Sequence, residues 1–166
     1  MFTYADTIVK RLLIFVAALA LCACNLDVPA PEGSTSGPSD PSTETFAAGL
    51  QIDLSKMTKT VTGTYYRDAK VGTGAEIAGA TTGVIIYRFA AFLKDGRAFD
   101  QQAVSTTVAF ANLIGGLRDA MRGMKVGGER IFVIPSELAF GITGIPGLGI
   151  PPNATVIYDV ILDGIP

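Results

Sequence analysis

Residues 83–100 constrain the fold more strongly than any other stretch of the chain. Residues 83–93 are rich in β-branched and aromatic side chains, which favour a pleated strand. This run meets Asp95-Gly96, and a return run follows at residues 97–100. Asp-Gly between two strand-like runs is a strong hairpin signal, because glycine readily adopts a positive φ. The stretch therefore predicts an antiparallel hairpin.

Further strands are predicted at residues 62–67, 130–134 and 155–162, where residues suited to a pleated surface are bounded by turn residues. Between residues 112 and 124 the apolar side chains recur at helical spacing instead. They are Leu113, Ile114, Leu117, Met121 and Met124. Gly115-Gly116 makes this helix weak on propensity alone, so packing must hold it. The pattern predicts an α+β domain with an antiparallel sheet and one short helix.

The residues that the chain lacks exclude whole classes of chemistry. It has no histidine, which removes Ser-His and Cys-His nucleophilic sites and any His-ligated metal. Both cysteines, Cys22 and Cys24, lie near the N-terminus. The net charge of −2, without a large Lys/Arg cluster, argues against nucleic acid as a partner. We therefore expect no metal and no cofactor.

The N-terminal residues have the pattern of a secretory leader. Lys10-Arg11 precedes an apolar run of about 12 residues, shorter than the roughly 20 that a membrane span requires. The sequence LCAC at 21–24 looks like a bacterial lipobox, which predicts a signal peptide over residues 1–23 and lipidation of Cys24. An ordinary signal peptide or a retained anchor helix are the alternatives. Residues 24–45, rich in Pro, Ser and Gly, predict a flexible tether, and residues 46–166 predict the globular domain.

Three stretches in this order resemble the FKBP family of peptidyl-prolyl isomerases. They are LKDGRAFD at 93–100, GMKVGGER at 123–130, and LAFG at 138–141 running on to IPPNAT at 150–155. The resemblance covers roughly residues 53–166. It implies a curved antiparallel β-sheet wrapped around one short α-helix, with an apolar pocket between them.

The resemblance also implies the site residues. Asp100, Phe89 and Phe140 are expected at the catalytic positions. The substrate-binding positions are Phe99, Phe110, Leu113, Ile114, Leu117, Ile150 and Tyr158. Val108 is an alternative to Phe110, and most of the apolar members would be ordinary core residues in another domain. Because Asp100 ends an apolar strand, its carboxylate is expected to enter the apolar pocket, which is costly without hydrogen bonds.

The chain departs from the family at two of these positions. Phe89 and Phe140 stand where the family usually has tyrosines, and no arginine follows Asp100 in the next four residues. Gln101, Tyr87, Tyr158 or backbone N–H groups remain as donors to Asp100. The absence of these tyrosines and of the arginine predicts a reduced isomerase rate. The apolar shape of the pocket is retained, so we still expect activity.

The resemblance implies a peptidyl-prolyl cis-trans isomerase that assists the folding of exported proteins in the bacterial cell envelope. The expected partners are proline-containing peptides, unfolded exported proteins and the membrane, through lipidated Cys24, with the domain a monomer on the periplasmic side. Asn25 after the modified cysteine favours the outer membrane. A prolyl-binding chaperone with weak or no catalysis is the first alternative, and a structural envelope lipoprotein is the second.

Overall fold

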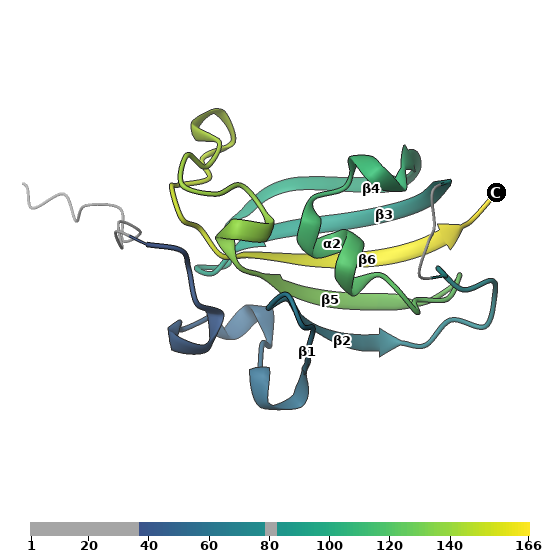
Figure 1. Ribbon diagram of the computed structural model, residues 1–166, viewed down its shortest axis with the longest axis horizontal. Helices are drawn as coiled ribbons and strands as arrows, with labels where there is room; N and C mark the ends of the chain where they lie inside the picture. Colours follow the sequence, from purple (N-terminus) through teal and green to yellow (C-terminus); the bar gives the residue numbers. More distant parts are fainter. Residues whose placement is uncertain (1–36, 79–82) are drawn as a thin grey trace, which may run out of the picture. The chain divides into compact units, whose positions relative to one another are not determined.

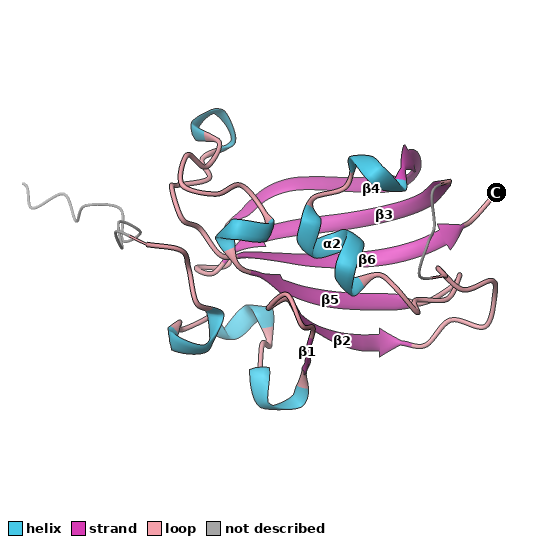
Figure 2. Ribbon diagram, in the orientation of Figure 1, coloured by secondary structure: helices cyan, strands magenta, loops and turns pink. Residues whose placement is uncertain are grey.

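The computed structural model describes residues 37–78 and 83–166, which lie within one compact unit. Its centre is a six-stranded antiparallel sheet in the order β1-β2-β5-β6-β3-β4, which curves around a short helix, α2 (Figure 1, Figure 2). The bounds are β1 Thr58–Lys59, β2 Tyr65–Lys70, β3 Val84–Leu93, β4 Ala98–Ala109, α2 Gly115–Ala120, β5 Glu129–Ile134 and β6 Val156–Gly164. The predicted fold class is confirmed.

The Asp-Gly hairpin forms between β3 and β4 as predicted. The Leu93 N–H donates to Arg97 O at 2.9 Å, and the Gly96 N–H closes the turn onto Leu93 O at 2.9 Å. Gly96 has φ 88°, a conformation that favours glycine. β4 is longer than the predicted return strand, because pairing with β3 continues to Ala109 past a register shift opposite Arg88. As a result β4 is a long edge strand of the sheet.

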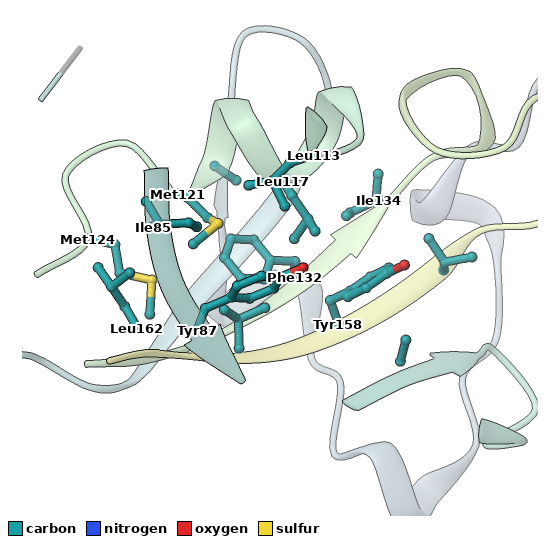
Figure 3. Packing of buried hydrophobic residues seen from close by; sticks show 14 of the residues in the cluster. Ile85, Tyr87, Leu113, Leu117, Met121, Met124, Phe132, Ile134, Tyr158 and Leu162 are labelled. Atoms are coloured by element: carbon teal, nitrogen blue, oxygen red, sulfur yellow. The ribbon is translucent and has the colours of Figure 1, made fainter. Parts of the chain in front are cut away.

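The two faces of the sheet bury different side chains. Along β3, Ile85, Tyr87, Ala91 and Leu93 alternate with more exposed residues and face α2 in the main core. Figure 3 shows Leu113 and Leu117 reaching from the segment around α2 towards Phe132 and the tyrosines. The opposite face carries a smaller cluster, covered by apolar side chains from residues 46–57. Its buried members on the sheet are Tyr65, Val133 and Ile157, and Phe92 and Ile131 pack against them.

α2 is shorter than the predicted helix and depends on packing, as its two glycines indicated. A 3-10 turn at Phe110–Asn112 precedes it. Helical structure ends before Gly123, where φ is 76°. At Gly116 a Cβ would overlap Ile134 Cγ2 on β5 and lie 3.0 Å from Thr64 Oγ1. Glycine at 116 therefore lets α2 approach the sheet closely.

Arg130 fixes the far end of α2 to the sheet. Its side chain is buried, lies over the Tyr66 ring at 4.5 Å and forms two hydrogen bonds to the Asp68 carboxylate at 2.6 and 3.1 Å. One guanidinium nitrogen also donates to Ala120 O at 2.7 Å, at the last residue of α2. This carbonyl has no partner within the helix, so Arg130 supplies the donor that the helix end needs.

The C-terminal end of the predicted tether, residues 24–45, overlaps the folded domain. Ser39 is buried, and it exchanges two hydrogen bonds with Ser136: Ser39 N–H to Ser136 Oγ at 3.0 Å, and Ser136 N–H to Ser39 Oγ at 2.7 Å. Pro41 is buried in a 3-10 turn, and Glu44 accepts a hydrogen bond from Thr155 at 3.2 Å. Residues 39–44 are therefore part of the folded unit, because their backbone and side-chain groups find partners on the domain. Cys24, the predicted signal peptide and the tether up to residue 36 lie outside the described residues.

Among residues 37–78 and 83–166, no helix has both the length and the apolar character needed to cross a bilayer.

Candidate functional site

Four aromatic rings meet on the α2 side of the sheet, from β3, β4, β6 and the loop between β5 and β6. The Tyr158 ring on β6 lies 5.6 Å from Phe89 and 5.9 Å from Phe99, measured between centroids. Phe99 in turn meets Phe140 edge-on at 6.0 Å. Edge-to-face and tilted contacts at these separations are favourable. The rings define an aromatic cluster of Phe89, Phe99, Phe140 and Tyr158.

The structure brings together all the apolar residues that the resemblance placed in the site. Five are buried in the main core: Phe110, Leu113, Leu117, Ile150 and Tyr158. Phe89, Phe99, Ile114 and Phe140 are partly buried and pack on that core, so a ligand would meet their exposed parts. Val108, the alternative to Phe110, is partly buried and also packs on this core.

Phe140 and Ile150 lie at the two ends of a loop that is held by its own backbone. Ile145 and Ile150 exchange two backbone hydrogen bonds, at 2.9 and 3.0 Å. The Gly141 N–H donates to Ser136 O at 2.8 Å, next to Phe140. The Arg97 guanidinium donates to Gly149 O at 2.6 Å and ties this loop to the β3–β4 hairpin. These contacts position Phe140 against Phe99 without a regular element.

Asp100 lies on the same sheet face as the cluster but does not enter the apolar interior. Register pairs Asp100 with Ala91 and Ala91 with Tyr158, so the three stand in one row across β4, β3 and β6. The Asp100 side chain is exposed, and its carboxylate accepts a hydrogen bond from the Gln101 N–H at 2.8 Å. The expectation of a carboxylate inside the apolar pocket is wrong, because β4 is the edge strand and its end is open to solvent.

Two tyrosine hydroxyls stand where the charge of Asp100 acts on them. Burial raises the pKa of Tyr158, and the Asp100 charge raises it further; the pKa of Tyr87 is raised by the same two causes. Both hydroxyls therefore stay protonated near neutral pH. Within the described residues neither hydroxyl has a hydrogen-bond partner, so each is free to donate to a ligand.

Tyr87 belongs to this neighbourhood, although it was considered only as a donor to Asp100 and not as a site residue. Its ring stacks on Phe89 at 5.4 Å with the planes 15° apart. The signal was present in the sequence, since residues two apart on a strand face the same side. Arg88, between them, faces the other side and pairs with Asp163 at 2.8 Å, as the same alternation predicts.

The chemistry that this arrangement supports is binding by shape and by hydroxyl donors. Across residues 37–78 and 83–166, no group of three or more His, Cys, Asp or Glu side chains is placed to hold a metal ion. The site offers aromatic and aliphatic surface, tyrosine hydroxyls and one nearby carboxylate. Such a surface suits a small apolar group attached to a polar backbone.

Comparison with known proteins gives one consistent result. The family model described as FKBP-type peptidyl-prolyl cis-trans isomerase matches residues 74–163. The chain is 39% identical over 109 residues to FK506-binding protein 4 of Neurospora crassa, a match covering 63% of this chain and 22% of that protein. It is 35% identical over 104 residues to the FKBP-type peptidyl-prolyl cis-trans isomerase FkpA of Escherichia coli K12, covering 61% and 37%. The matches thus span about a fifth to a third of these relatives.

Solved structures agree on the fold. The crystal structure of a peptidyl-prolyl cis-trans isomerase from Pseudomonas syringae pv. tomato superposes with a TM-score of 0.62 at 26% identity, covering 70% of this chain and 85% of the other. The crystal structure of FkpA from Escherichia coli gives 0.60 at 28% identity, covering 70% and 54%.

Proposed function

Because the chain belongs to the FKBP-type peptidyl-prolyl cis-trans isomerase family, we propose that it catalyses cis-trans isomerisation of Xaa-Pro bonds at the aromatic cluster. The observation that carries this proposal is the meeting of Phe89, Phe99, Phe140 and Tyr158 on the core that includes the buried Leu117, with part of three of these rings left exposed. A prolyl ring is apolar and compact, and aromatic faces at these separations suit it.

The mechanism follows from the physics of the amide bond. Resonance keeps the bond planar and sets a rotation barrier of about 18–20 kcal/mol. The planar amide is more polar than the twisted one, so apolar surroundings weaken the resonance that opposes rotation. A surface that fits the twisted amide better than either planar isomer accelerates both directions equally. Rotation breaks no covalent bond and requires no proton transfer.

Tyr158 supplies the hydrogen-bond donor in this proposal. Phe89 and Phe140 have no hydroxyl, whereas the Tyr158 hydroxyl lies in the cluster and has no acceptor among the described residues. Burial and the charge of Asp100 raise its pKa, so it remains protonated. A donor to a substrate carbonyl would help to hold the peptide while the prolyl bond turns. Asp100 then contributes through its charge, which favours the protonated Tyr158 hydroxyl.

A prolyl-binding module with little catalysis is the second candidate. The observation that favours it is the absence of hydroxyls at Phe89 and Phe140, where the family usually has tyrosines. Such a module would bind proline-rich or unfolded chains as tightly as an isomerase does. It would leave the cis-trans exchange rate unchanged.

The cellular setting is part of the same proposal. The lipobox-like sequence at 21–24 supports a lipoprotein whose Cys24 carries the membrane anchor, with exported proteins as clients and the outer membrane as its location. Intact-mass measurement of membrane-extracted protein tests this. Retention of residues 1–23, or a soluble form cut elsewhere, would contradict it.

A protease-coupled assay on a short Phe-Pro peptide separates the two candidates. The isomerase proposal expects faster conversion in the presence of the protein, with a lower rate for Tyr158→Phe. Binding of a proline-rich peptide without faster conversion would favour the second candidate.

A further inference from the structure

A pocket lies on the sheet face opposite α2. Its volume is about 540 Å³, and it is bounded by residues 49–51 and by β2, β3, β5 and β6. Phe92 and Ile157 form part of its floor and are directly paired across β3 and β6. Both belong to the smaller apolar cluster rather than to the main core. The pocket is therefore separated from the aromatic cluster by the thickness of the sheet.

The pocket exists because the N-terminal segment covers only part of this face. Apolar side chains from residues 46–57 cover the row that contains Val133 and Ile157. The next row pairs Arg67 with Ile131 and Ile131 with Asp159, across β2, β5 and β6. All three residues of that row line the pocket. Parts of Phe92 and Ile131 are left exposed, with charged groups beside them.

The charged side chains of the pocket form no ion pairs among the described residues. Arg67, Glu129 and Asp159 line it, and none of the three forms an ion pair within the described part of the chain. Asp159 is the most informative, because its Oδ1 is buried with no hydrogen-bond partner. Burial raises the pKa of this carboxyl, Glu129 raises it further, and Arg67 opposes the shift. A half-buried carboxylate without a donor is unfavourable for the fold.

We propose that this pocket binds a lysine or arginine side chain of an extended polypeptide, with an apolar neighbour of that side chain resting on the exposed parts of Phe92 and Ile131. Two carboxylates face one arginine, so the charge of the pocket favours a cation. Long basic side chains bury their methylene stems on apolar surface while the cationic head pairs with carboxylates. The site takes no part in isomerisation, and it gives the protein a second point of contact with a client chain.

Fluorescence anisotropy with a labelled proline-free peptide, Ala-Leu-Arg-Phe-Ala, tests the proposal on the full chain. A matched peptide with citrulline in place of arginine keeps the shape and removes the charge. We expect the arginine peptide to bind at least about tenfold more tightly than the citrulline peptide, since charge-assisted hydrogen bonds are roughly twice as strong as neutral ones. Because neither peptide contains proline, failure here leaves the isomerase proposal untouched.

Variants localise the binding. Asp159→Asn should lower the affinity for the arginine peptide by about tenfold, and Glu129→Gln should lower it less. Glu76 is an exposed carboxylate outside the pocket, so Glu76→Gln should change this affinity by less than about twofold. Asp159→Asn removes an unpartnered buried charge, so its denaturation midpoint should equal or exceed that of the wild type. Equal binding of the two peptides, no binding at all, equal losses in Asp159→Asn and Glu76→Gln, or a marked loss of stability in Asp159→Asn would each overturn the proposal.

Discussion

Adjacent glycines at the start of α2 should respond to alanine in opposite directions. In a helix, Gly→Ala normally stabilises a protein by about 0.4–1 kcal/mol, because alanine loses less conformational entropy on folding. At Gly115 a new Cβ would lie 3.6 Å from Leu138 O, an ordinary contact. At Gly116 it would overlap Ile134 Cγ2, and Ile134 is fully buried and has no space to move. Overpacking of this kind costs about 1–3 kcal/mol.

We therefore expect Gly115→Ala to be neutral or stabilising by up to about 1 kcal/mol. Gly116→Ala should lower the free energy of unfolding by up to about 2.5 kcal/mol, because the cost of overpacking exceeds the gain in helix propensity. Urea denaturation of the two variants and the wild type measures both values, with an unchanged m value as the check that the folded state is the same. A Gly116→Ala variant as stable as Gly115→Ala would refute the close approach of α2 to β5 on which the site's floor rests.

Three further predictions concern the site and the ends of the folded unit. Leu117→Ala should cost about 2–5 kcal/mol in chemical denaturation, because Leu117 is buried, and should weaken prolyl-peptide binding in a titration; unchanged stability and binding would remove Leu117 from the floor. A chain starting at residue 46 should be less stable than one starting at residue 37 by about 1–3 kcal/mol, since it lacks the paired Ser39–Ser136 hydrogen bonds; equal thermal midpoints would restore the predicted tether. Tyr158→Phe should lower the isomerisation rate, and the wild-type rate should stay flat up to about pH 10 because burial and Asp100 raise the Tyr158 pKa; a wild-type rate falling between pH 8 and 9 would contradict this.

The sign of the tyrosine effect on stability follows from the same shift. Because the pKa of Tyr158 is higher in the folded than in the unfolded chain, the folded state favours the protonated hydroxyl. Its contribution to stability is complete below about pH 10 and is lost as the pH rises further.

Local patterns were enough to predict the strands β2 to β6 and the short helix, but not β1. The Asp95-Gly96 turn set the β3–β4 hairpin, and alternation along β3 placed Phe89 on the α2 face and Arg88 on the other. The glycines at 115 and 116 signalled a helix that depends on packing, and the close approach at Gly116 explains why. These features depend on residues that are a few positions apart in the sequence, so a short stretch of sequence is enough to predict them.

Features set by distant contacts were not predictable in this way. Ser39 and Ser136 are 97 positions apart, and nothing in a Pro/Ser-rich stretch indicates that one serine will pair with the domain. The exposure of Asp100 depends on β4 being an edge strand, which only the order of all six strands determines. The pocket at Asp159 likewise depends on where residues 46–57 stop covering the sheet.

NMR exchange spectroscopy on a short Phe-Pro peptide, with a catalytic amount of the protein, tests the central claim most directly. Uncatalysed isomerisation takes tens to hundreds of seconds and gives no cis-trans cross-peaks at short mixing times. The account predicts cross-peaks with the wild type, and their loss in Phe99→Ala, a variant that opens the aromatic cluster while leaving the Asp159 pocket intact. Peptide binding without cross-peaks, or cross-peaks that Phe99→Ala leaves unchanged, would contradict isomerisation at this site.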